Sequence, residues 1–405
     1  MTPSSDASPE LASAPPLAGL RRVLVALAIG AAVFAASCLL ATPVLRPSGM
    51  GEEFAAMAAD PFALGGNFPH RMLGPLLGYC LGLGGERYWI FHHAVVVVML
   101  ALMAGGALAR GASPSRAAWL TVALCGAGGI QAYKAAVGYA DPLTFTLLIA
   151  AALGAAHAAI FWPLILGALL NHELSSLFVP WLVYVRHTAA SGLGQRDFAG
   201  AVLVTAAYAG FRAVVAAARP TGTWDTKFFL SQASLSVDTL AMWLLLTVVV
   251  VISNGPLLIA LCWQLFDRAI TSARIAAGVF VVGIYGTAIA ALDIWRFAGL
   301  PIVPIYFAGL ALLQRPRGLA VLLVLGGLTM ATSDLQFRVF ERLIEQVVAV
   351  NARGEQHIVL TVERELWPLF AGYLVGLAAM VFLGHRLART TNRAADRPLA
   401  TSPSP

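Results

Sequence analysis

Charged and polar side chains are gathered into short stretches between long apolar runs, and the first of these stretches is residues 51–78. It contains the adjacent carboxylates Glu52 and Glu53 and, further along, the pair His70-Arg71. A carboxylate can act as a general base that takes a proton from an incoming hydroxyl, and a planar guanidinium is well suited to holding a phosphate. Charges buried in or near lipid are costly, so they usually pair with one another or line a functional cavity. We therefore expect this stretch to line the mouth of a site that faces away from the cytoplasm.

Other polar groups stand at the ends of apolar segments, on the side that the topology below predicts to face outward. They are Asp60, Lys134, the tetrapeptide Tyr139-Ala140-Asp141-Pro142, the tripeptide Asn171-His172-Glu173 and the tetrapeptide Asp293-Ile294-Trp295-Arg296. The inner boundary carries arginines and almost no other polar group. This one-sided distribution is the strongest functional signal in the sequence.

Each group also has a purely structural interpretation. Glu52 and Glu53 can be solvated loop acids, and Asp60, which precedes a proline, is typical of a turn or a helix cap. Arg71 can anchor the chain at the membrane interface instead of holding a phosphate. The candidate structural ion pairs are Lys134 with Asp141, Glu173 with Arg71 or Lys134, and Asp293 with Arg296. The neighbouring histidines His92-His93 lie in an apolar run and are predicted to be packed.

The composition indicates an integral membrane protein. Of the 405 residues, 59% are hydrophobic and 11% are charged, with a mean hydropathy of +0.79, whereas soluble domains carry about a quarter charged residues. The pI near 9.4 comes from short basic clusters between apolar runs, which favours membrane topology over nucleic-acid binding.

The cysteines and histidines predict no metal site or cofactor. The four cysteines, Cys38, Cys80, Cys125 and Cys262, all lie in apolar stretches and show no CxxC spacing. Neither a disulfide framework nor a zinc site is therefore predicted, and no histidine- or carboxylate-rich metal motif stands out.

The apolar runs predict an all-α polytopic protein with about twelve transmembrane helices, several of them short or broken. The predicted crossings are 21–45, 87–109, 117–136, 141–158, 160–171, 173–186, 198–217, 239–266, 275–292, 300–313, 318–333 and 367–385. The pair 160–171 and 173–186 would meet within the outer half of the membrane, where non-helical backbone requires surrounding protein or water. The run 239–266 is interrupted at Ser253-Asn254-Gly255-Pro256 and is counted as one broken crossing.

Arginines set the predicted orientation. Every predicted inner loop carries at least two of them, which places both termini in the cytoplasm. Residues 1–20 and 388–405 are predicted to be disordered cytoplasmic tails, and 21–387 a single transmembrane domain. Its predicted outer loops are 46–86, 218–238 and 334–366. The Ala-, Gly- and Arg-rich composition without a sorting signal favours a bacterial cytoplasmic (inner) membrane.

The last outer segment, 334–366, begins with an amphipathic pattern. Its apolar residues recur at helical spacing beside charged ones; they are Leu335, Phe337, Phe340, Leu343, Ile344, Val347 and Val348. This pattern predicts a helix that lies on the membrane surface, with a lid over the substrate as the second interpretation.

The order of these motifs resembles the polytopic glycosyltransferases of the C-type fold, which use polyprenyl-phosphate-linked sugars. Four motifs are similar to the R-x-L-x-P, Y-x-D-P, N-x-E-[TS] and D-x-x-R elements of bacterial relatives of that superfamily. They are Arg71-Met72-Leu73-Gly74-Pro75, Tyr139-Ala140-Asp141-Pro142, Asn171-His172-Glu173-Leu174-Ser175 and Asp293-Ile294-Trp295-Arg296. The resemblance covers roughly residues 20–330. Two departures are an EE pair where many members have DD, DE or ED, and the lack of a large soluble domain after the last span.

The resemblance implies a role for each motif. Glu52 or Glu53, in the first outer loop, is the candidate catalytic base. Arg71, Lys134 and Arg296 are candidate phosphate ligands, and His172 and Glu173 would line the cavity. The implied partners are membrane lipid and a polyprenyl-phosphate-linked sugar donor. The alternatives are a transporter or flippase of a lipid-linked or anionic solute, motivated by the broken helices, and a non-catalytic subunit of an envelope-assembly machine.

Overall fold

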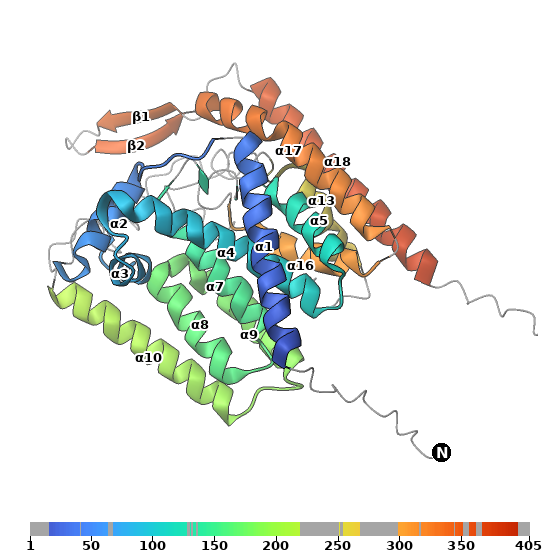
Figure 1. Ribbon diagram of the computed structural model, residues 1–405. Coiled ribbons are helices and arrows are strands. Elements are labelled where there is room, and N and C mark those ends of the chain that lie inside the picture. The colour runs from blue at the N-terminus through green and yellow to red at the C-terminus, as the bar shows by residue number, and fades with distance from the viewer. Residues whose placement is uncertain are drawn as a thin grey trace, which may run out of the picture.

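The structure is a computed structural model, and it is almost entirely helical (Figure 1). It describes residues 16–40, 42–63, 68–127, 130, 133–134, 137–218, 251, 254–267, 299–315, 317–343, 345–350, 356–361 and 367–395. The predicted all-α class is confirmed for these residues, with one small exception near the carboxyl-terminal end. That exception is a hairpin of two antiparallel strands, β1 (Glu345–Val350) and β2 (Gln356–Thr361), in which Glu345 faces Thr361.

The first half of the chain alternates long and short helices. In chain order these are α1 (Pro16–Leu40), α2 (Met50–Ala59), η1 (Pro61–Ala63), α3 (Leu73–Cys80), η2 (Gly85–Arg87), α4 (Tyr88–Ala109), α5 (Pro114–Cys125), α7 (Asp141–Leu153), α8 (Ala158–Asn171), η3 (Glu173–Phe178), α9 (Val179–Ala189) and α10 (Gln195–Ala218). The second half has η4 (Gly255–Leu257), α13 (Leu258–Phe266), α16 (Ile302–Leu313), α17 (Gly318–Leu343), the hairpin and α18 (Trp367–Ala395).

Four described helices are long and apolar enough to cross a membrane, judged by length and composition. They are Gly19–Leu39, Gly85–Ala109, Gln195–Ala218 and Ala371–Thr390. This supports a membrane protein, while twelve crossings remain a prediction. Several predicted spans are shorter helices in the structure, such as α7, α8, α16 and α5, which ends at Cys125 although the apolar run continues to residue 136.

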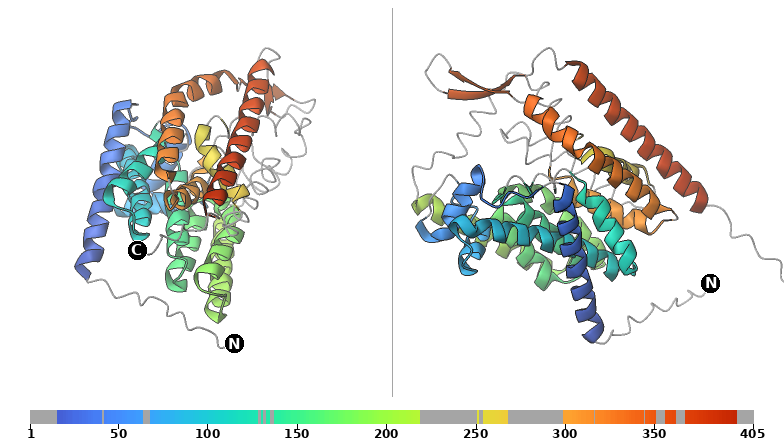
Figure 2. Two further views of the ribbon diagram at one scale, coloured as in Figure 1. Left: turned by 90° about the vertical axis from the view of Figure 1, so that its right-hand side faces the viewer. Right: turned by 45° about the horizontal axis from the view of Figure 1, so that its top comes forward.

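Helix α4 lies at the centre of the bundle, and α1, α10 and α18 lie at its margins (Figure 2). Within the most apolar window of α4, 61% of the residues are buried, against 11% in α10 and in α18. Met99, Leu100 and Met103 of α4 are fully buried in the main core cluster. The marginal helices therefore present their apolar side chains outward, which suits contact with lipid.

Close helix contacts are formed at small residues, as is common where helices pack in lipid. A Cβ atom added to Gly30 of α1 would lie 2.8 Å from the carbonyl oxygen of Val97 on α4. A Cβ added to Gly384 of α18 would lie 2.6 Å from Cβ of Cys262 on α13. These glycines let the backbones of the paired helices approach closely.

A buried ion pair joins α8, α9 and α10 at the end opposite the polar motifs. Arg186 donates to both carboxylate oxygens of Asp197, at 2.8 and 3.4 Å, and to the carbonyl oxygen of Ala155 at 2.6 Å. The indole of Trp162 and the backbone N–H of Gly194 also donate to Asp197. Because the two charges pair with each other and each has further hydrogen bonds, this cluster has a structural role.

Two sequence expectations about breaks are confirmed. Helices α8 and α9 are both short and are joined through His172 and the 3-10 helix η3, as the run around Asn171-His172-Glu173 predicted. The chain also breaks at Gly255, whose φ is 51° and which begins η4, ahead of α13. The backbone N–H of Leu257 then donates to Thr329 Oγ1 of α17 at 3.2 Å. A side chain thus provides the hydrogen-bond acceptor for a backbone N–H next to the break.

The expected surface helix over residues 335–348 is wrong in two respects. Its first part is a direct continuation of α17, which runs unbroken from Gly318 to Leu343. Val347 and Val348 lie in β1, where they face Val359 and Ile358. Valine and isoleucine favour strands, and pairing with a second β-rich run overrides the helical spacing. The helix α18 likewise continues to Ala395, past the predicted start of the tail at residue 388.

Candidate functional site

The segment after α1 lies along Lys134 and residues 137–139 and positions α2. The backbone N–H of Val44 donates to the carbonyl oxygen of Lys134 at 3.0 Å, and that of Ser48 donates to Val137 at 3.1 Å. Ser48 Oγ in turn accepts from the backbone N–H of Val137 at 3.2 Å. The start of α2, which carries Glu52 and Glu53, is thereby held beside the Tyr139-Ala140-Asp141-Pro142 motif.

Two glycines make this contact sterically feasible. A Cβ on Gly51 would lie 1.9 Å from the carbonyl oxygen of Val137, and a Cβ on Gly138 would lie 2.8 Å from Cα of Gly51. Gly138 also has a φ of 97°, a left-handed conformation that favours glycine. Its N–H donates to His92 Nδ1 at 3.0 Å, and His92 Nε2 is 2.7 Å from the carbonyl oxygen of Tyr133. His92 is therefore a packed residue, as predicted, and it fixes the turn on α4.

Asn171, at the end of α8, joins three motifs that are far apart in the sequence. Its Nδ2 donates to the carbonyl oxygen of Ala140 at 2.6 Å and to Thr144 Oγ1 at 2.8 Å. Its Oδ1 accepts from the backbone N–H of Gly74 at 3.0 Å, 97 residues away in the chain. Asn171 is completely buried. One amide therefore holds the start of α3, the start of α7 and the end of α8 together.

Arg71 and Glu173 form a bidentate ion pair next to this joint. Arg71 Nε donates to Glu173 Oε2 at 2.9 Å, and Nη2 contacts Glu173 Oε1. His70 Nε2 lies 3.3 Å from the same Oε2 atom. The Arg71 guanidinium also stacks on the ring of Phe68, with Cζ 4.2 Å from the ring centroid. The Arg71 side chain is 4% exposed and that of Glu173 is 35% exposed, so Glu173 is the outer partner.

His172 connects this pair to Asp141. Its Nδ1 accepts a hydrogen bond from the backbone N–H of Leu174 at 3.1 Å, so in the neutral ring the proton is on Nε2. That Nε2 faces Asp141 Oδ1 at 3.6 Å, and Nδ1 lies 3.7 Å from Glu173 Oε2. Asp141 is the first residue of α7, where the helix dipole favours a negative charge. The result is a continuous row of charged and polar groups from Asp141 to His70.

The surroundings of Glu173 lower the pKa of its carboxyl group. Glu173 lies in η3, outside the four helices of membrane-spanning length. Burial acts to raise the pKa of its carboxyl group, but the electrostatic effect of His172, the positive charge of Arg71 and hydrogen bonds from His70 and Arg71 outweigh burial. The pKa of Glu173 is therefore well below its usual range, and the group is a carboxylate at neutral pH.

The structure thus brings together Arg71, His70, Asp141, Asn171, His172 and Glu173 from the predicted set. It also decides between the structural ion pairs that the sequence left open. Glu173 pairs with Arg71, and Asp141 faces His172. Lys134 pairs with neither carboxylate in the described part of the chain: its buried ammonium donates to the carbonyl oxygen of Ser37 on α1 at 2.8 Å.

The other predicted residues that the structure describes lie in α2, in the turn after it and just before α7. Glu52 is exposed and Glu53 half-buried, in the first turn of α2. Asp60 Oδ1 accepts from the backbone N–H of Ala63 at 3.3 Å, which confirms the turn interpretation. The Tyr139 hydroxyl lies 3.1 Å from where a Cβ of Gly49 would be. Asp293 and Arg296 lie outside the described residues.

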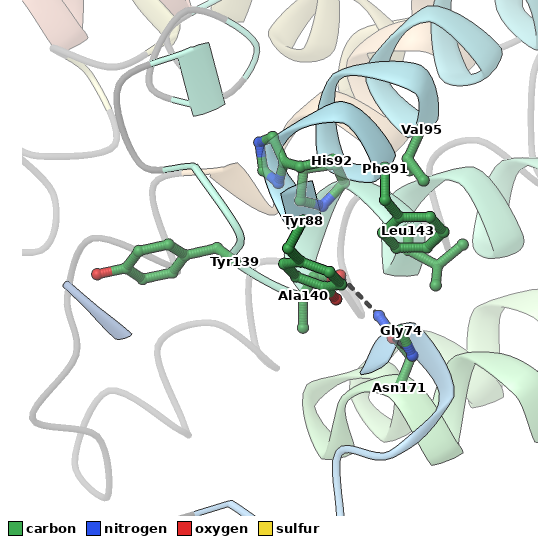
Figure 3. A pocket seen from close by; sticks show the side chains of 10 residues that line it. Gly74, Tyr88, Phe91, His92, Val95, Tyr139, Ala140, Leu143 and Asn171 are labelled. Carbon is green, nitrogen blue, oxygen red and sulfur yellow. Dashed lines mark hydrogen bonds between the residues drawn. The ribbon is translucent and has the colours of Figure 1, made fainter. Parts of the chain in front are cut away.

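A small pocket lies beside the joint at Asn171 (Figure 3). Its lining includes Tyr88, Phe91 and His92 of α4 and Leu143 of α7, while Tyr139 points away from the other side chains. Its interior has room for about one water molecule. Within the described residues it is a packing gap in the scaffold and not a substrate cavity.

Sequence reasoning missed two polar residues on α10. Tyr208 is half-buried and packs against the main core cluster, and Arg212, one helical turn further along, is also half-buried. The available signal was an arginine inside an otherwise apolar run, which usually marks a functional position. Among the described residues, no group of three or more metal-ligating side chains could hold an ion.

No protein-family model, curated protein or solved structure matches this chain.

Proposed function

We propose that this chain is a membrane glycosyltransferase that moves a sugar from a polyprenyl-phosphate-linked donor to an envelope acceptor at the outer face of a bacterial cytoplasmic membrane. The observation that supports this proposal is the convergence of three polar motifs. Arg71 pairs with Glu173 across 102 residues of sequence, and Asn171 joins Gly74 to Ala140 in the same place. If each charged group only formed a local structural ion pair, the motifs of the predicted site would not be expected to join in one network.

The proposed reaction needs a base and a group that stabilises the leaving phosphate. One carboxylate of the pair Glu52 and Glu53 takes the proton of the acceptor hydroxyl, whose oxygen bonds to the anomeric carbon. The bond from that carbon to the phosphate oxygen breaks, and the electron pair leaves with the phosphate. Arg71 and His70 stabilise the charge that develops on it. Glu173 holds the guanidinium of Arg71 in place, and exposed Glu52 is accessible to an acceptor.

The apolar exterior fits a substrate carried by lipid. The α10 window of membrane-spanning length is only 11% buried, and Leu203 and Val214 on it are 69% and 66% exposed. A polyprenyl chain can lie against such a surface while its phosphate reaches the polar end of the bundle.

The test is a transfer assay with the full chain reconstituted in liposomes. Polyprenyl-phosphate-linked sugars are supplied one at a time with an envelope fraction as acceptor, and the released polyprenyl phosphate is measured by mass spectrometry. We expect release by the wild type and a loss of about 100-fold or more in the double variant Glu52→Gln, Glu53→Gln. The matched control is Glu86→Gln, which removes an exposed carboxylate from η2, next to α2.

Two results would contradict the proposal. Full activity in the double variant would remove both acids from the mechanism. Movement of the donor across the bilayer without release of polyprenyl phosphate would instead assign a transporter or flippase. Comparable membrane insertion of all variants, measured by membrane fractionation, is required for either comparison.

A further inference from the structure

Helix α3 buries its small side chains and exposes its large ones. The buried residues are Gly74, Pro75 and Gly78. The large apolar side chains lie on the other side, where Leu77 is exposed and Leu81, which follows the helix, is 63% exposed. The helix contains no charged residue. Its exposed side is therefore apolar, whereas a helix with one face in water normally exposes polar side chains.

The 3-10 helix η1 extends this apolar surface. The ring centroid of Phe62 lies 6.2 Å from that of Tyr79 on α3, in an edge-on arrangement. Phe62 is 71% exposed, and Tyr79 is also exposed. Aromatic side chains such as tyrosine are enriched where lipid headgroups meet acyl chains. The exposed surface formed by Phe62, Leu77, Tyr79, Cys80 and Leu81 is called the α3 patch below.

Helix α2, which packs against α3, has the opposite distribution of side chains. It buries the large apolar side chains of Phe54 and Met57 and exposes Glu52 and Ala56. This is the pattern of a helix with one face in water. The two helices are neighbours within the same predicted outer segment, so the difference indicates that their exposed sides meet different surroundings.

Helix α3 lies across the end of α8. The backbone N–H of Gly74 donates to Asn171 at the end of α8, and a Cβ atom on Gly167 of α8 would lie 3.4 Å from Leu73 Cδ2. In Figure 1, α3 is seen nearly along its axis, whereas α8 and α10 run across the picture. Helix α8 also packs against α10, which has the length and the apolar exterior of a membrane-spanning helix. A short helix that crosses such helices steeply at their end lies close to the plane of the membrane surface.

We propose that the α3 patch inserts into the lipid at the membrane surface, while the exposed side of α2 stays in water. An exposed apolar patch of this kind marks a contact with a membrane or a protein. Bilayer lipid is the occupant that fits its position, because interfacial helices bury leucine and phenylalanine side chains among the lipid headgroups and the first part of the acyl chains. The inference depends on the membrane character of the chain and not on the proposed transferase.

Insertion of α3 would also fix the depth of the polar network. Arg71 immediately precedes α3, and its partner Glu173 follows Asn171, which holds Gly74. Lipid contact by α3 therefore keeps the Arg71–Glu173 pair at the level of the membrane surface.

The test is the accessibility of spin labels on the full chain in liposomes of phosphatidylcholine and phosphatidylglycerol. Cys80 is exposed and takes a nitroxide label without any substitution. The variant Cys80→Ala, labelled in the same way, corrects for label on the other cysteines. Phe62→Cys and Leu81→Cys are two further patch sites in the Cys80→Ala chain, and Ala56→Cys on α2 is the matched control. Relaxation of each label is measured with oxygen, which concentrates in lipid, and with a water-soluble nickel chelate.

We expect oxygen to dominate at the three patch sites, with the labels about 5–10 Å below the membrane surface, and the nickel chelate to dominate at Ala56→Cys. Patch labels as accessible to the nickel chelate as Ala56→Cys would place the patch in water and overturn the proposal. Labels shielded from both reagents would show that protein, such as a second copy of the chain, covers the patch, and would equally refute lipid contact. Oxygen dominance at Ala56→Cys as well would contradict the difference between α2 and α3. Equal melting temperatures establish that the variants are folded.

Discussion

Replacement of Asn171 by alanine should destabilise the polar end of the bundle. Among the described residues, no other replacement of a single asparagine or glutamine should have a larger effect. The variant removes three hydrogen bonds, two donated to Ala140 and Thr144 and one accepted from Gly74. The carbonyl oxygen of Ala140 keeps other donors, the backbone N–H and hydroxyl of Thr144. The buried N–H of Gly74 loses the acceptor that the structure gives it.

The magnitude follows from these contacts. Each net hydrogen bond contributes about 1 kcal/mol, and a buried N–H without an acceptor costs about 1–3 kcal/mol. The expected loss in the free energy of unfolding is therefore about 3–5 kcal/mol. For a chain of this size, roughly 2 °C per kcal/mol gives a decrease in melting temperature of about 6–10 °C.

The assay is thermal unfolding of the purified chain in one detergent at one scan rate, because membrane proteins often unfold irreversibly. Thr146→Ala is the matched control, since its hydroxyl donates only within α7, to Pro142; it should change the melting temperature by less than about 2 °C. The double variant Asn171→Ala, Thr144→Ala should lose less than the sum of the single losses, because the two side chains share a hydrogen bond. A melting temperature of Asn171→Ala within about 1 °C of the wild type would refute the role of Asn171 as a joint.

Two further predictions concern charge and close packing. Because the pKa of Glu173 is lowered in the folded chain, its contribution to stability is present above the unfolded value of about 4.3 and is lost as the pH falls through the folded value. The difference in melting temperature between wild type and Glu173→Gln should shrink below about pH 4, where the carboxylate begins to be protonated; a difference that does not shrink there would contradict the pairing with Arg71. Gly51→Ala should displace α2, since the added Cβ would lie 1.9 Å from a backbone oxygen, and should lower the melting temperature. Gly210→Ala, in open space on α10, should leave it unchanged or raise it slightly; equal effects of the two variants would disprove the close contact.

Much of the local structure was predictable from the sequence, because it depends on neighbours in the chain. The apolar runs predicted a helical membrane protein, and Gly255-Pro256 predicted the break before α13. The polar tripeptide Asn171-His172-Glu173 predicted that two short helices meet there. Asp60 before a proline predicted a turn. In each case the deciding interactions span at most four or five residues.

The partners of the charged groups were decided only by the tertiary structure. The sequence could not choose between Arg71 and Lys134 as the partner of Glu173, because both residues were predicted to lie on the outer side of the membrane. The choice depends on how the helices cross and on their rotation, which changes by about 100° with each residue of a helix. Lys134 is consequently held by the carbonyl oxygen of Ser37, while Glu173 pairs with Arg71.

The sequence by itself determined which charged residues stand at the ends of the apolar segments, because composition and spacing set the helix ends. The tertiary structure alone decided which of those charges meet. An ion pair needs atoms within about 4 Å, and no local pattern determines distances across residues that lie a hundred positions apart in the chain.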